Sequence, residues 1–249
     1  MSNPAVAIHE LGFRYPGAAG NCFRQLNLEV ATGDRFGLFG PNGAGKTTLM
    51  NCMTGLLTFN EGTIELLGRP VTKNKKELNR LFGFVPQDFS FYHELSPIEN
   101  LAFFGAWSGM HKSAIKKRTA ELLEILDMGA DGHKPVQKFS GGMKRKVNLA
   151  IGVIHQPKIL FLDEPTVGVD VQTRTAIINY LKDLNAAGTT LVYTSHQLNE
   201  AEELCDTIAL IDNGKIIAHN TLDNLLLEHG VPGLEGLFIN LTGKKYSDG

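Results

Sequence analysis

The sequence predicts an α/β protein with a mostly parallel sheet, an N-terminal antiparallel β subdomain and an inserted α-helical subdomain. Three observations carry this prediction. Short apolar strands alternate with helices along most of the chain, which favours a parallel sheet covered by helices on both faces. Residues 5–13 and 25–30 instead show the two-residue alternation of antiparallel strands. Residues from about 88 to 140 show only the spacing of helices.

The N-terminal subdomain is predicted from two alternating segments, 5–13 and 25–30. Pro16 and Gly17 lie between them and favour a turn, so the two segments are expected to pair as antiparallel strands. A third strand at 35–39 is short and mostly apolar, and it runs directly into a glycine-rich loop. A helix is expected to begin at the end of that loop.

The helical insertion follows a short strand that is expected at 83–86. Apolar residues recur at helical spacing in 97–107 and in 113–128. Ser96 and Ser113 precede these apolar patterns, and serine is a preferred residue at the N-cap of a helix. We therefore expect both serines to cap their helices.

The second half of the chain supplies the rest of the sheet. Fully apolar strands are expected at 159–162 and 190–195, followed by helices at 171–187 and 197–205. Asn213-Gly214 is a favoured hairpin turn, so a β-hairpin is expected to close the sheet. The remaining expected elements are helices at 46–56 and 141–155 and hairpin strands at 208–211 and 215–218.

Composition and charge exclude several classes of function. The chain has 20% charged residues and a net charge of −2, whereas a dedicated nucleic-acid binder is usually strongly basic. Cys22, Cys52 and Cys205 form no CxxC or zinc pattern and are expected to be reduced thiols. The start lacks a signal-peptide pattern, and no segment approaches the roughly 20 apolar residues of a membrane helix. A cytoplasmic protein is therefore expected.

The glycine-rich loop fits the phosphate-binding pattern GxxxxGK[ST]. Its glycines let successive backbone N–H groups turn toward phosphate oxygens, and the following helix adds its positive N-terminal end. Lys46 is expected to reach the β- and γ-phosphates, and the Thr47 hydroxyl to ligate Mg²⁺. The flanking strand and helix argue against a glycine-rich turn without a ligand. The residues expected to bind nucleotide here are Gly40, Pro41, Asn42, Gly43, Ala44, Gly45, Lys46, Thr47 and Thr48.

Two acidic residues follow the apolar strand at 159–162. The strand delivers Asp163 to the carboxyl edge of the sheet, where open α/β sheets bind their ligands. Asp163 is expected to hold Mg²⁺, largely through water, and Glu164 to accept a proton from an attacking water. Alone, an acidic strand end is often only a solvated surface feature. Together with the phosphate loop, it predicts a nucleoside-triphosphate hydrolase.

The segment Phe139–Met143, which reads FSGGM, resembles the signature motif of ABC ATPases. The resemblance extends over nearly the whole chain and implies a P-loop NTPase (RecA-like) core. Residues 1–249 are then a single ABC ATPase domain with a helical subdomain at about 88–140 and a short C-terminal extension at about 220–249. A helix N-terminus opened by serine and two glycines is a second anion site, which in this family binds the γ-phosphate of ATP held by the other subunit. The residues implied are Ser140, Gly141 and Gly142.

The same resemblance implies roles for four further residues. Gln87 lies where the family has its Q-loop glutamine, which acts in catalysis and at the metal, and His196 lies where it has its switch histidine. Asp170 ends a segment that resembles the D-loop, and Tyr15 is placed like the aromatic residue that stacks on adenine. Taken alone, Tyr15 also fits a surface aromatic at a strand end, and His196 also fits a surface or capping residue.

The signature motif departs from its commonest form, because Phe139 and Met143 replace the usual leucine and glutamine. With the Met-Lys-Arg continuation, this motif resembles the ATPases of type 2 ABC exporters, a group that includes daunorubicin-resistance, sodium-export and nodulation ATPases. Many members carry a longer C-terminal region. Further segments that share the resemblance are Gly168–Asp170, Thr194–His196, Glu200–Glu203 and 234–243.

The family resemblance also implies partners. ATP binding is expected to join two subunits, as a homodimer or with a related ATPase. A separate integral-membrane permease is expected to bind near the helical insertion, so that the chain is peripheral on the inner face of the cell membrane and contacts it only through the permease. No nucleic-acid partner is expected. The residues Phe89, Phe91, Tyr92 and Leu95 fit the lining of the permease cleft or, equally, a packed core of the helical subdomain.

Other functions fit the sequence less well. An ABC importer shares the hydrolytic motifs and stays open. A soluble mechanical ABC ATPase acting in DNA repair or translation usually carries long insertions or two cassettes, and this chain has neither. A GTPase or small-molecule kinase does not explain the signature motif, and the NKxD motif of GTPases is missing.

Two basic clusters are open to two interpretations. They fit contacts with lipid or nucleic acid, but solvated helix and loop faces are the commoner meaning of such charge runs. The clusters are Lys73, Lys75, Lys76 and Arg80, and Lys116, Lys117 and Arg118.

Overall fold

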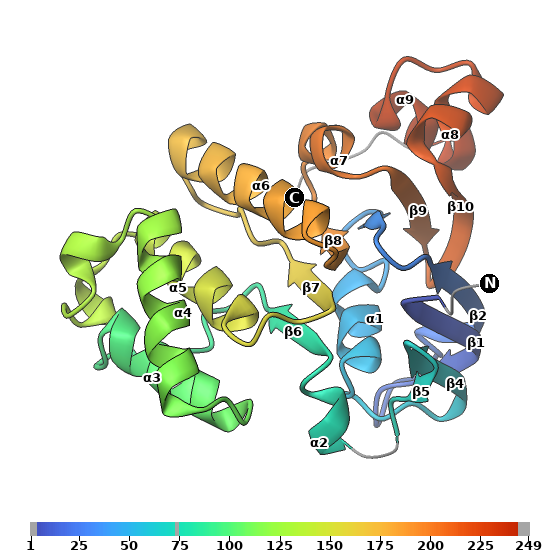
Figure 1. The fold of residues 1–249 in the computed structure, drawn as a ribbon. Helices are drawn as coiled ribbons and strands as arrows, with labels where there is room; N and C mark the ends of the chain where they lie inside the picture. The colour runs from blue at the N-terminus through green and yellow to red at the C-terminus, as the bar shows by residue number, and fades with distance from the viewer. Residues whose placement is uncertain (1–3, 73–74, 244–249) are drawn as a thin grey trace. The chain divides into compact units, whose positions relative to one another are not determined.

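The computed structural model describes residues 4–72 and 75–243, without the side chains of Lys75 and Lys76. The chain divides into two compact units. Unit 1 comprises residues 1–78 and 190–249, and unit 2 comprises residues 79–189. Figure 1 colours the chain by residue number, so that unit 1 appears at both ends of the colour scale and unit 2 in its middle.

Unit 1 contains a four-stranded sheet of strand order β2-β1-β4-β5, in which all neighbouring strands are antiparallel. Apolar residues alternate along β2, whose inward-facing side chains are buried and whose other side chains are exposed. Val6 pairs with Val30 on one side and with Leu66 on the other, which fixes the register. The strands are β1 (Val6–Phe13), β2 (Phe23–Val30), β4 (Glu61–Leu66) and β5 (Arg69–Pro70).

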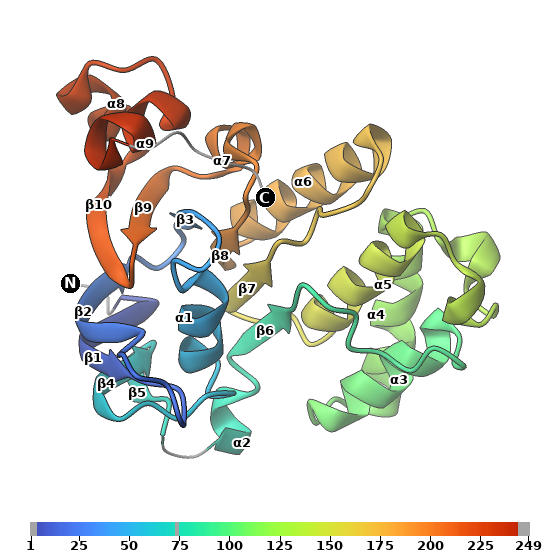
Figure 2. The ribbon, with the colours of Figure 1, turned by 180° about the vertical axis from the view of Figure 1, so that it is seen from behind.

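Unit 1 also contains parallel strands. β3 (Arg35–Phe39) lies between β8 (Thr190–Thr194) and β9 (Thr207–Asp212) and runs parallel to both. β10 (Lys215–Thr221) returns antiparallel to β9 as the expected closing hairpin. In both ribbon views, α8 and α9 lie side by side next to this hairpin (Figures 1 and 2). The helices of unit 1 are α1 (Lys46–Met53), α2 (Lys75–Leu78), α7 (Leu198–Leu204), α8 (Leu222–His229) and α9 (Leu234–Thr242).

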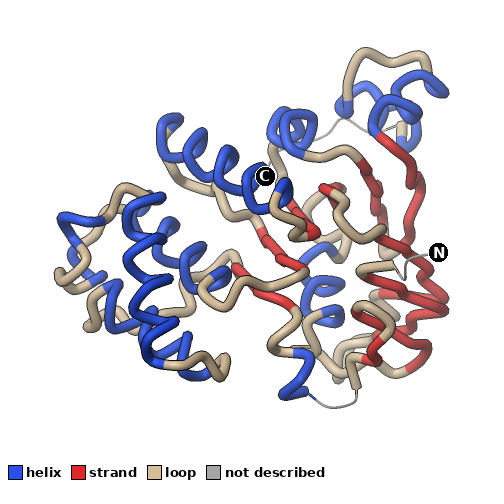
Figure 3. Tube along the Cα trace, viewed as in Figure 1, coloured by secondary structure: helices blue, strands red, loops and turns tan. Residues whose placement is uncertain are grey.

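Unit 2 contains the parallel pair β6 (Phe82–Val85) and β7 (Ile159–Asp163), together with a group of helices. Every residue of β7 is buried, as its apolar sequence predicts. Figure 3 shows that helix dominates this unit, and α3 packs against both α4 and α5. The helices are α3 (Pro97–Trp107), α4 (Lys112–Ile125), α5 (Gly141–Val153) and α6 (Val171–Ala186), with short 3₁₀ turns at Gly129–Asp131 and Val136–Lys138.

The predicted α/β class, with an antiparallel N-terminal sheet and an inserted group of helices, is confirmed. Ser96 is the N-cap of α3, where its side chain accepts a hydrogen bond from the Glu99 N–H and completes a capping box. The prediction that Ser113 caps the next helix was wrong, because α4 begins at Lys112 after an extended His111. The chain leaves α3 through Gly109 in a left-handed conformation (φ 80°) and enters α4 before it reaches Ser113.

Several elements were not predicted, namely β4, β5, α2, α8 and α9. All three cysteines are free thiols, which agrees with the expectation from their spacing. Within residues 4–72 and 75–243, every helix is too short or too polar to cross a bilayer.

Candidate functional site

The predicted phosphate loop of unit 1 joins β3 to α1 and depends on its glycines. Gly43 (φ 79°) and Gly45 (φ 109°) adopt left-handed conformations that side chains disfavour. A Cβ atom at Gly40 would lie 2.0 Å from the Ile211 carbonyl oxygen, so the loop also needs glycine to pass the end of β9. The turn of the β9–β10 hairpin supports the loop from outside, because the Gly214 N–H donates to the Ala44 carbonyl at 3.1 Å.

Lys46 extends back over this loop. Its ammonium group donates to the carbonyl oxygens of Gly40 at 2.7 Å and Pro41 at 3.2 Å, and the residue is only 6% exposed. The carbonyl oxygens of Gly40 and Pro41 thus hold the positive charge of Lys46 next to the glycine-rich loop. Thr47 is exposed on the first turn of α1, and Thr48 is partly buried. The loop therefore combines glycines at positive φ, a fixed cation and an accessible hydroxyl, which is suitable for binding phosphates.

Tyr15 lies beside the same helix. Its hydroxyl shares a 2.9 Å hydrogen bond with the Thr48 hydroxyl, and its ring packs edge-on against Phe13 with centroids 4.8 Å apart. The side chain is 43% exposed. The structure therefore anchors the ring next to the phosphate loop and leaves part of it accessible, as a base-stacking residue requires.

His196 follows β8 in unit 1 and is partly buried. A hydrogen-bond network holds the segment around it: the buried Glu200 carboxylate accepts from the Tyr193 hydroxyl at 2.6 Å and the Ser195 hydroxyl at 3.3 Å. The Ser195 oxygen in turn accepts from the Gln197 N–H at 2.9 Å. The network fixes Ser195 and Gln197, which lie on either side of His196, and so fixes the backbone that carries the histidine.

The acidic pair of unit 2 lies at the carboxyl end of β7. Asp163 is 2% exposed and Glu164 is 9% exposed. Glu164 adopts a left-handed backbone conformation (φ 51°), which is uncommon for a residue other than glycine and often marks a functional position. The Gln87 side-chain amide donates to a Glu164 carboxylate oxygen at 2.9 Å. The structure thus joins two predicted catalytic residues that lie 77 positions apart.

The signature segment of unit 2 opens α5. Ser140 is the exposed N-cap residue and accepts from the Met143 N–H at 3.3 Å. A Cβ atom at Gly142 would lie 3.1 Å from the Thr173 hydroxyl, so the start of α5 lies against the start of α6. Asp170 is the N-cap of α6 and accepts from the Thr173 N–H at 2.9 Å and the Thr173 hydroxyl at 2.8 Å. These two hydrogen bonds lower the pKa of Asp170.

The aromatic residues after Gln87 differ in how deeply they are buried. Phe89 stacks on Phe91 with centroids 5.3 Å apart, and Phe91 is buried. Tyr92 is 46% exposed, and its ring forms a T-shaped pair with the Phe103 ring, with centroids 5.0 Å apart. Leu95 is partly buried. Phe91 therefore belongs to the packed interior of unit 2, Phe89 is only partly buried, and Tyr92 lies at the surface.

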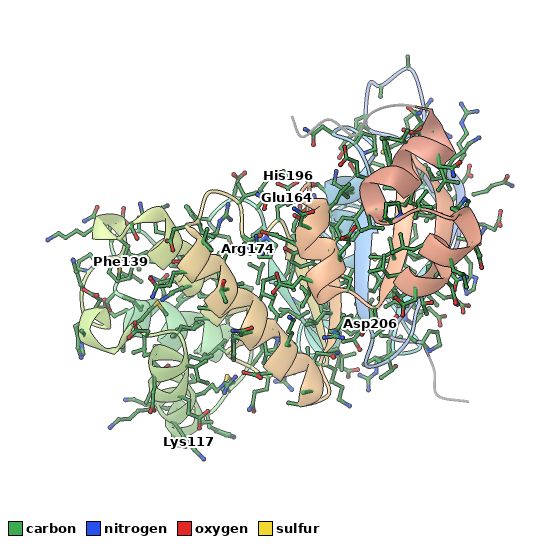
Figure 4. The ribbon with its side chains drawn as sticks, turned by 90° about the horizontal axis from the view of Figure 1, so that it is seen from above. Lys117, Phe139, Glu164, Arg174, His196 and Asp206 are labelled. Atoms are coloured by element: carbon green, nitrogen blue, oxygen red, sulfur yellow. The ribbon has the colours of Figure 1, made fainter. Side chains whose placement is uncertain are left out.

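The second basic cluster makes internal contacts. Lys117 projects from α4 (Figure 4) and pairs with Glu121 at 4.0 Å. Arg118 donates to Glu121 at 3.0 Å and to the Tyr180 hydroxyl at 3.1 Å. Lys116 is exposed on the same helix. In the first cluster, Lys73 lies outside the described residues. The Arg80 guanidinium group lies so close to Gly109 that a Cβ atom added there would be 2.5 Å from it.

The sequence prediction missed Arg145, a buried residue of α5 that contacts the backbone of Gln87 and of Val167. Arg145 was missed because it stands in the run Lys144-Arg145-Lys146, and such a run of basic residues is typical of an exposed helix face. The only sequence signal was a basic residue at a helix position where the apolar spacing predicts burial.

Comparison with known proteins identifies the family. A family model described as "ABC transporter" matches residues 23–167, which is more than half of the chain. The chain belongs to the ABC transporter family. The solved structures described below confirm the predicted P-loop NTPase fold. The family model and the named relatives confirm the resemblance to export ATPases.

Named relatives support this assignment. The linearmycin resistance ATP-binding protein LnrL of Bacillus subtilis is 40% identical over 80% of this chain and 64% of its own length. A Nod factor export ATP-binding protein I of Cupriavidus metallidurans is 40% identical over 81% of this chain and 66% of its own length. The daunorubicin resistance ATP-binding protein DrrA3 of Streptomyces coeruleorubidus is 38% identical over 82% of this chain and 65% of its own length. The match thus spans slightly less than two thirds of each of these relatives.

Solved structures agree with the fold. The structure of an ATP-binding subunit of an ABC transporter is 27% identical, has a TM-score of 0.89 and covers 96% of this chain and 99% of its own. A dimeric ATP-binding cassette in a post-hydrolysis state, bound to ADP and Pi, is 24% identical with a TM-score of 0.79, over 87% of this chain and 98% of its own. The second similarity supports the fold alone.

Proposed function

We propose that this chain binds and hydrolyses ATP as the nucleotide-binding subunit of an ABC transporter. Hydrolysis is coupled to transport, in the export direction, through a separate membrane permease. The names of the three relatives describe two resistance proteins and one export protein, all ATP-binding, which supports export over import. They lend no support to a mechanical ATPase of DNA repair or translation.

The phosphate loop binds the triphosphate. Backbone N–H groups of the loop residues other than Pro41 surround the phosphates, and Lys46 exchanges loop carbonyls for β- and γ-phosphate oxygens. Tyr15 stacks on the adenine ring, supported by its hydrogen bond to Thr48. Ser140, Gly141 and Gly142 supply a second anion site at the start of α5.

The oxygen donors predicted for the metal have the chemistry that Mg²⁺ prefers. Thr47 offers an accessible hydroxyl, Asp163 offers a carboxylate at a strand end, and Gln87 offers an amide oxygen. Mg²⁺, when bound, neutralises charge that develops on the phosphate oxygens during transfer. Hard oxygen donors of this kind fit the ion, and they would bind it together with phosphate oxygens and water.

The hydrogen bond between Gln87 and Glu164 is the observation that carries the hydrolytic part of the proposal. Because the Gln87 amide N–H donates to it, the Glu164 side chain is held in a fixed direction, as a general base requires. Glu164 takes the proton from the attacking water, and His196 donates a hydrogen bond to the γ-phosphate and helps to orient that water. Asp170 belongs to the D-loop at the subunit contact.

The partners follow from the same proposal. Two ATPase subunits, identical or related, form a dimer on ATP binding, and each signature segment meets the ATP of the other subunit. The permease docks on unit 2, where Tyr92, Phe103 and Trp107 expose aromatic surface of the kind found in interface cores. The chain then works at the cytoplasmic face of the membrane.

An ATPase assay paired with a nucleotide-binding assay tests this function. Glu164→Gln keeps the shape of the side chain but removes its basicity, so we expect hydrolysis to fall by a factor on the order of 10²–10⁴ while ATP affinity is kept. Lys46→Ala is expected to weaken ATP binding itself. Glu124→Gln, at an exposed site on α4, is the matched control and should behave as the wild type. Wild-type turnover by Glu164→Gln would disprove the assignment of the base.

A further inference from the structure

Arg145 is a buried cation at the centre of unit 2. It lies on α5 and is 7% exposed. Its guanidinium group donates through Nη1 to the Gln87 carbonyl oxygen and through Nε to the Val167 carbonyl oxygen at 3.3 Å. It also lies over the Phe89 ring, 4.7 Å from the centroid. A single side chain therefore contacts the segment of Gln87 and the segment that follows Glu164.

These contacts lie on both sides of the Gln87–Glu164 hydrogen bond. One carbonyl belongs to Gln87 itself, and the other belongs to Val167, whose own N–H donates to the Glu164 carbonyl at 3.3 Å. The guanidinium group is planar and its donors have a fixed separation, so binding both carbonyls fixes the spacing of the two segments. Gln87 and Glu164 are thereby kept within hydrogen-bond distance.

Burying a guanidinium group is costly unless its donors and charge are compensated. Here two backbone carbonyls and an aromatic face offset part of that cost. Burial still lowers the pKa of the Arg145 guanidinium group, and the charges of Asp88 and Glu164 oppose that shift. A lysine at this place would supply a compact point charge that cannot reproduce the planar, two-carbonyl arrangement. The position is therefore specific for arginine and not merely for positive charge.

The helix that carries Arg145 begins at Ser140. An α-helix transmits displacement along its axis as a rigid element, so a shift at its first turn moves Arg145 as well. Ser140 is exposed at that first turn, whereas Arg145 faces the interior of unit 2. One helix thus links an exposed anion site to the two segments that carry Gln87 and Glu164.

We propose that Arg145 is a positioning residue, which holds the Gln87–Glu164 pair in its reactive geometry and couples that pair to the signature helix. The inference rests on the proposed function, because it requires Glu164 to act as the base. Arg145 acts on catalysis through Gln87 and Glu164, because the two carbonyl oxygens that it binds belong to Gln87 and Val167 and not to the phosphate loop. Loss of Arg145 therefore lowers kcat and leaves the affinity for ATP unchanged.

The first experiment compares Arg145→Lys and Arg145→Met with the wild type in steady-state ATPase assays, with melting temperature and ATP affinity measured alongside. Arg145→Lys is expected to fold and to lower kcat on the order of 10–100-fold, the effect of misplacing a catalytic group by about 1 Å, with KM changed less than about twofold. Lys146→Met, at the next and partly exposed position of α5, is the control and should retain wild-type kcat. Wild-type kcat for Arg145→Lys, or an equal loss of kcat and ATP affinity, would overturn the proposal.

The second experiment is a double-mutant cycle measured by single-turnover hydrolysis. If Arg145 works through Glu164, Arg145→Lys should cause little further loss in the Glu164→Gln background, because the two changes remove the same contribution. Losses that simply multiply would show that Arg145 acts independently of the base and would refute the coupling. Failure of the proposed function is recognised separately, since Glu164→Gln alone would then hydrolyse ATP at the wild-type rate and both proposals would fall.

Discussion

The phosphate loop of unit 1 and the Gln87–Glu164 pair of unit 2 are built in opposite ways. The loop is made of backbone within one short segment, and its shape depends on Gly43 and Gly45 at positive φ. The pair is made of side chains from distant segments, joined by one hydrogen bond and a shared guanidinium group. Geometry is thus encoded locally in the first case and by tertiary contacts in the second.

This difference explains why binding and hydrolysis should respond separately to mutation. A glycine loop tolerates few changes at its own positions, because its shape depends on Gly43 and Gly45 at positive φ. The carboxylate–amide pair depends on the Arg145 contacts from α5 and on the unusual conformation of Glu164. Changes at the two places should therefore produce different combinations of ATP affinity, turnover and assembly.

The largest effect is expected from Gly45→Ala. Its Cβ would lie 2.8 Å from the fully buried Phe23 ring, and the position has φ 109°, so strain of about 1–3 kcal/mol adds to the clash. We expect ATP binding, measured by calorimetry, to be lost. Gly43→Ala is the matched control, because its φ of 79° causes backbone strain but no atom lies within 4 Å of the added Cβ. This variant should bind ATP more weakly than the wild type but still measurably. Equal affinities for the two variants would contradict this account of the loop.

The next largest effect is expected on dimer formation, from a change in the signature segment. Ser140→Arg places a long cation at the exposed start of α5 and leaves the phosphate loop intact, so ATP should still bind while the ATP-dependent dimer and hydrolysis are lost. Light scattering of Glu164→Gln with Mg²⁺–ATP should show a dimer that is missing with Mg²⁺–ADP and missing when Ser140→Arg is added. If Ser140→Arg leaves both the dimer and the wild-type ATPase rate unchanged, the two subunits do not share their sites.

The smallest effect is expected at Tyr15. Tyr15→Ala removes the ring, so the dissociation constant for ATP should rise roughly 5- to 150-fold, the equivalent of about 1–3 kcal/mol of stacking. Tyr15→Phe and Tyr15→Trp keep an aromatic face and should bind ATP nearly as the wild type does, and GTP should be tolerated. Fluorescent-nucleotide titration of the three variants provides the measurement. Unchanged affinity in Tyr15→Ala would mean that the ring serves only its contacts with Phe13 and Thr48.

The accuracy of the sequence predictions follows the same division between local and tertiary information. β3 and α3 were predicted with their observed bounds, because an apolar strand and a capping box are written in adjacent residues. β4 was missed because only Ile64 and Leu66 of its six residues are buried, so that its alternation is too short to recognise. α8 has a Thr221 cap and a terminal Gly230, and these local signals were overlooked.

The site predictions show the same limit. The phosphate loop was predicted residue by residue, since its pattern depends on glycines in a fixed order. The pairing of Gln87 with Glu164 and the part played by Arg145 were not, because both depend on contacts across unit 2. Their roles as catalytic and positioning residues stay predictions that the experiments above test.

The turn of the β9–β10 hairpin has a consequence for mutational tolerance. Gly214 donates to the Ala44 carbonyl, and a Cβ atom there would lie 1.8 Å from the Cys22 carbonyl oxygen. Position 214 is therefore as intolerant of side chains as the phosphate loop that it supports, although it lies far away in sequence. In a genetic screen for loss of nucleotide binding, substitutions at this hairpin would be recovered alongside those in the loop itself, and homologues that vary elsewhere in the hairpin would be expected to keep this glycine.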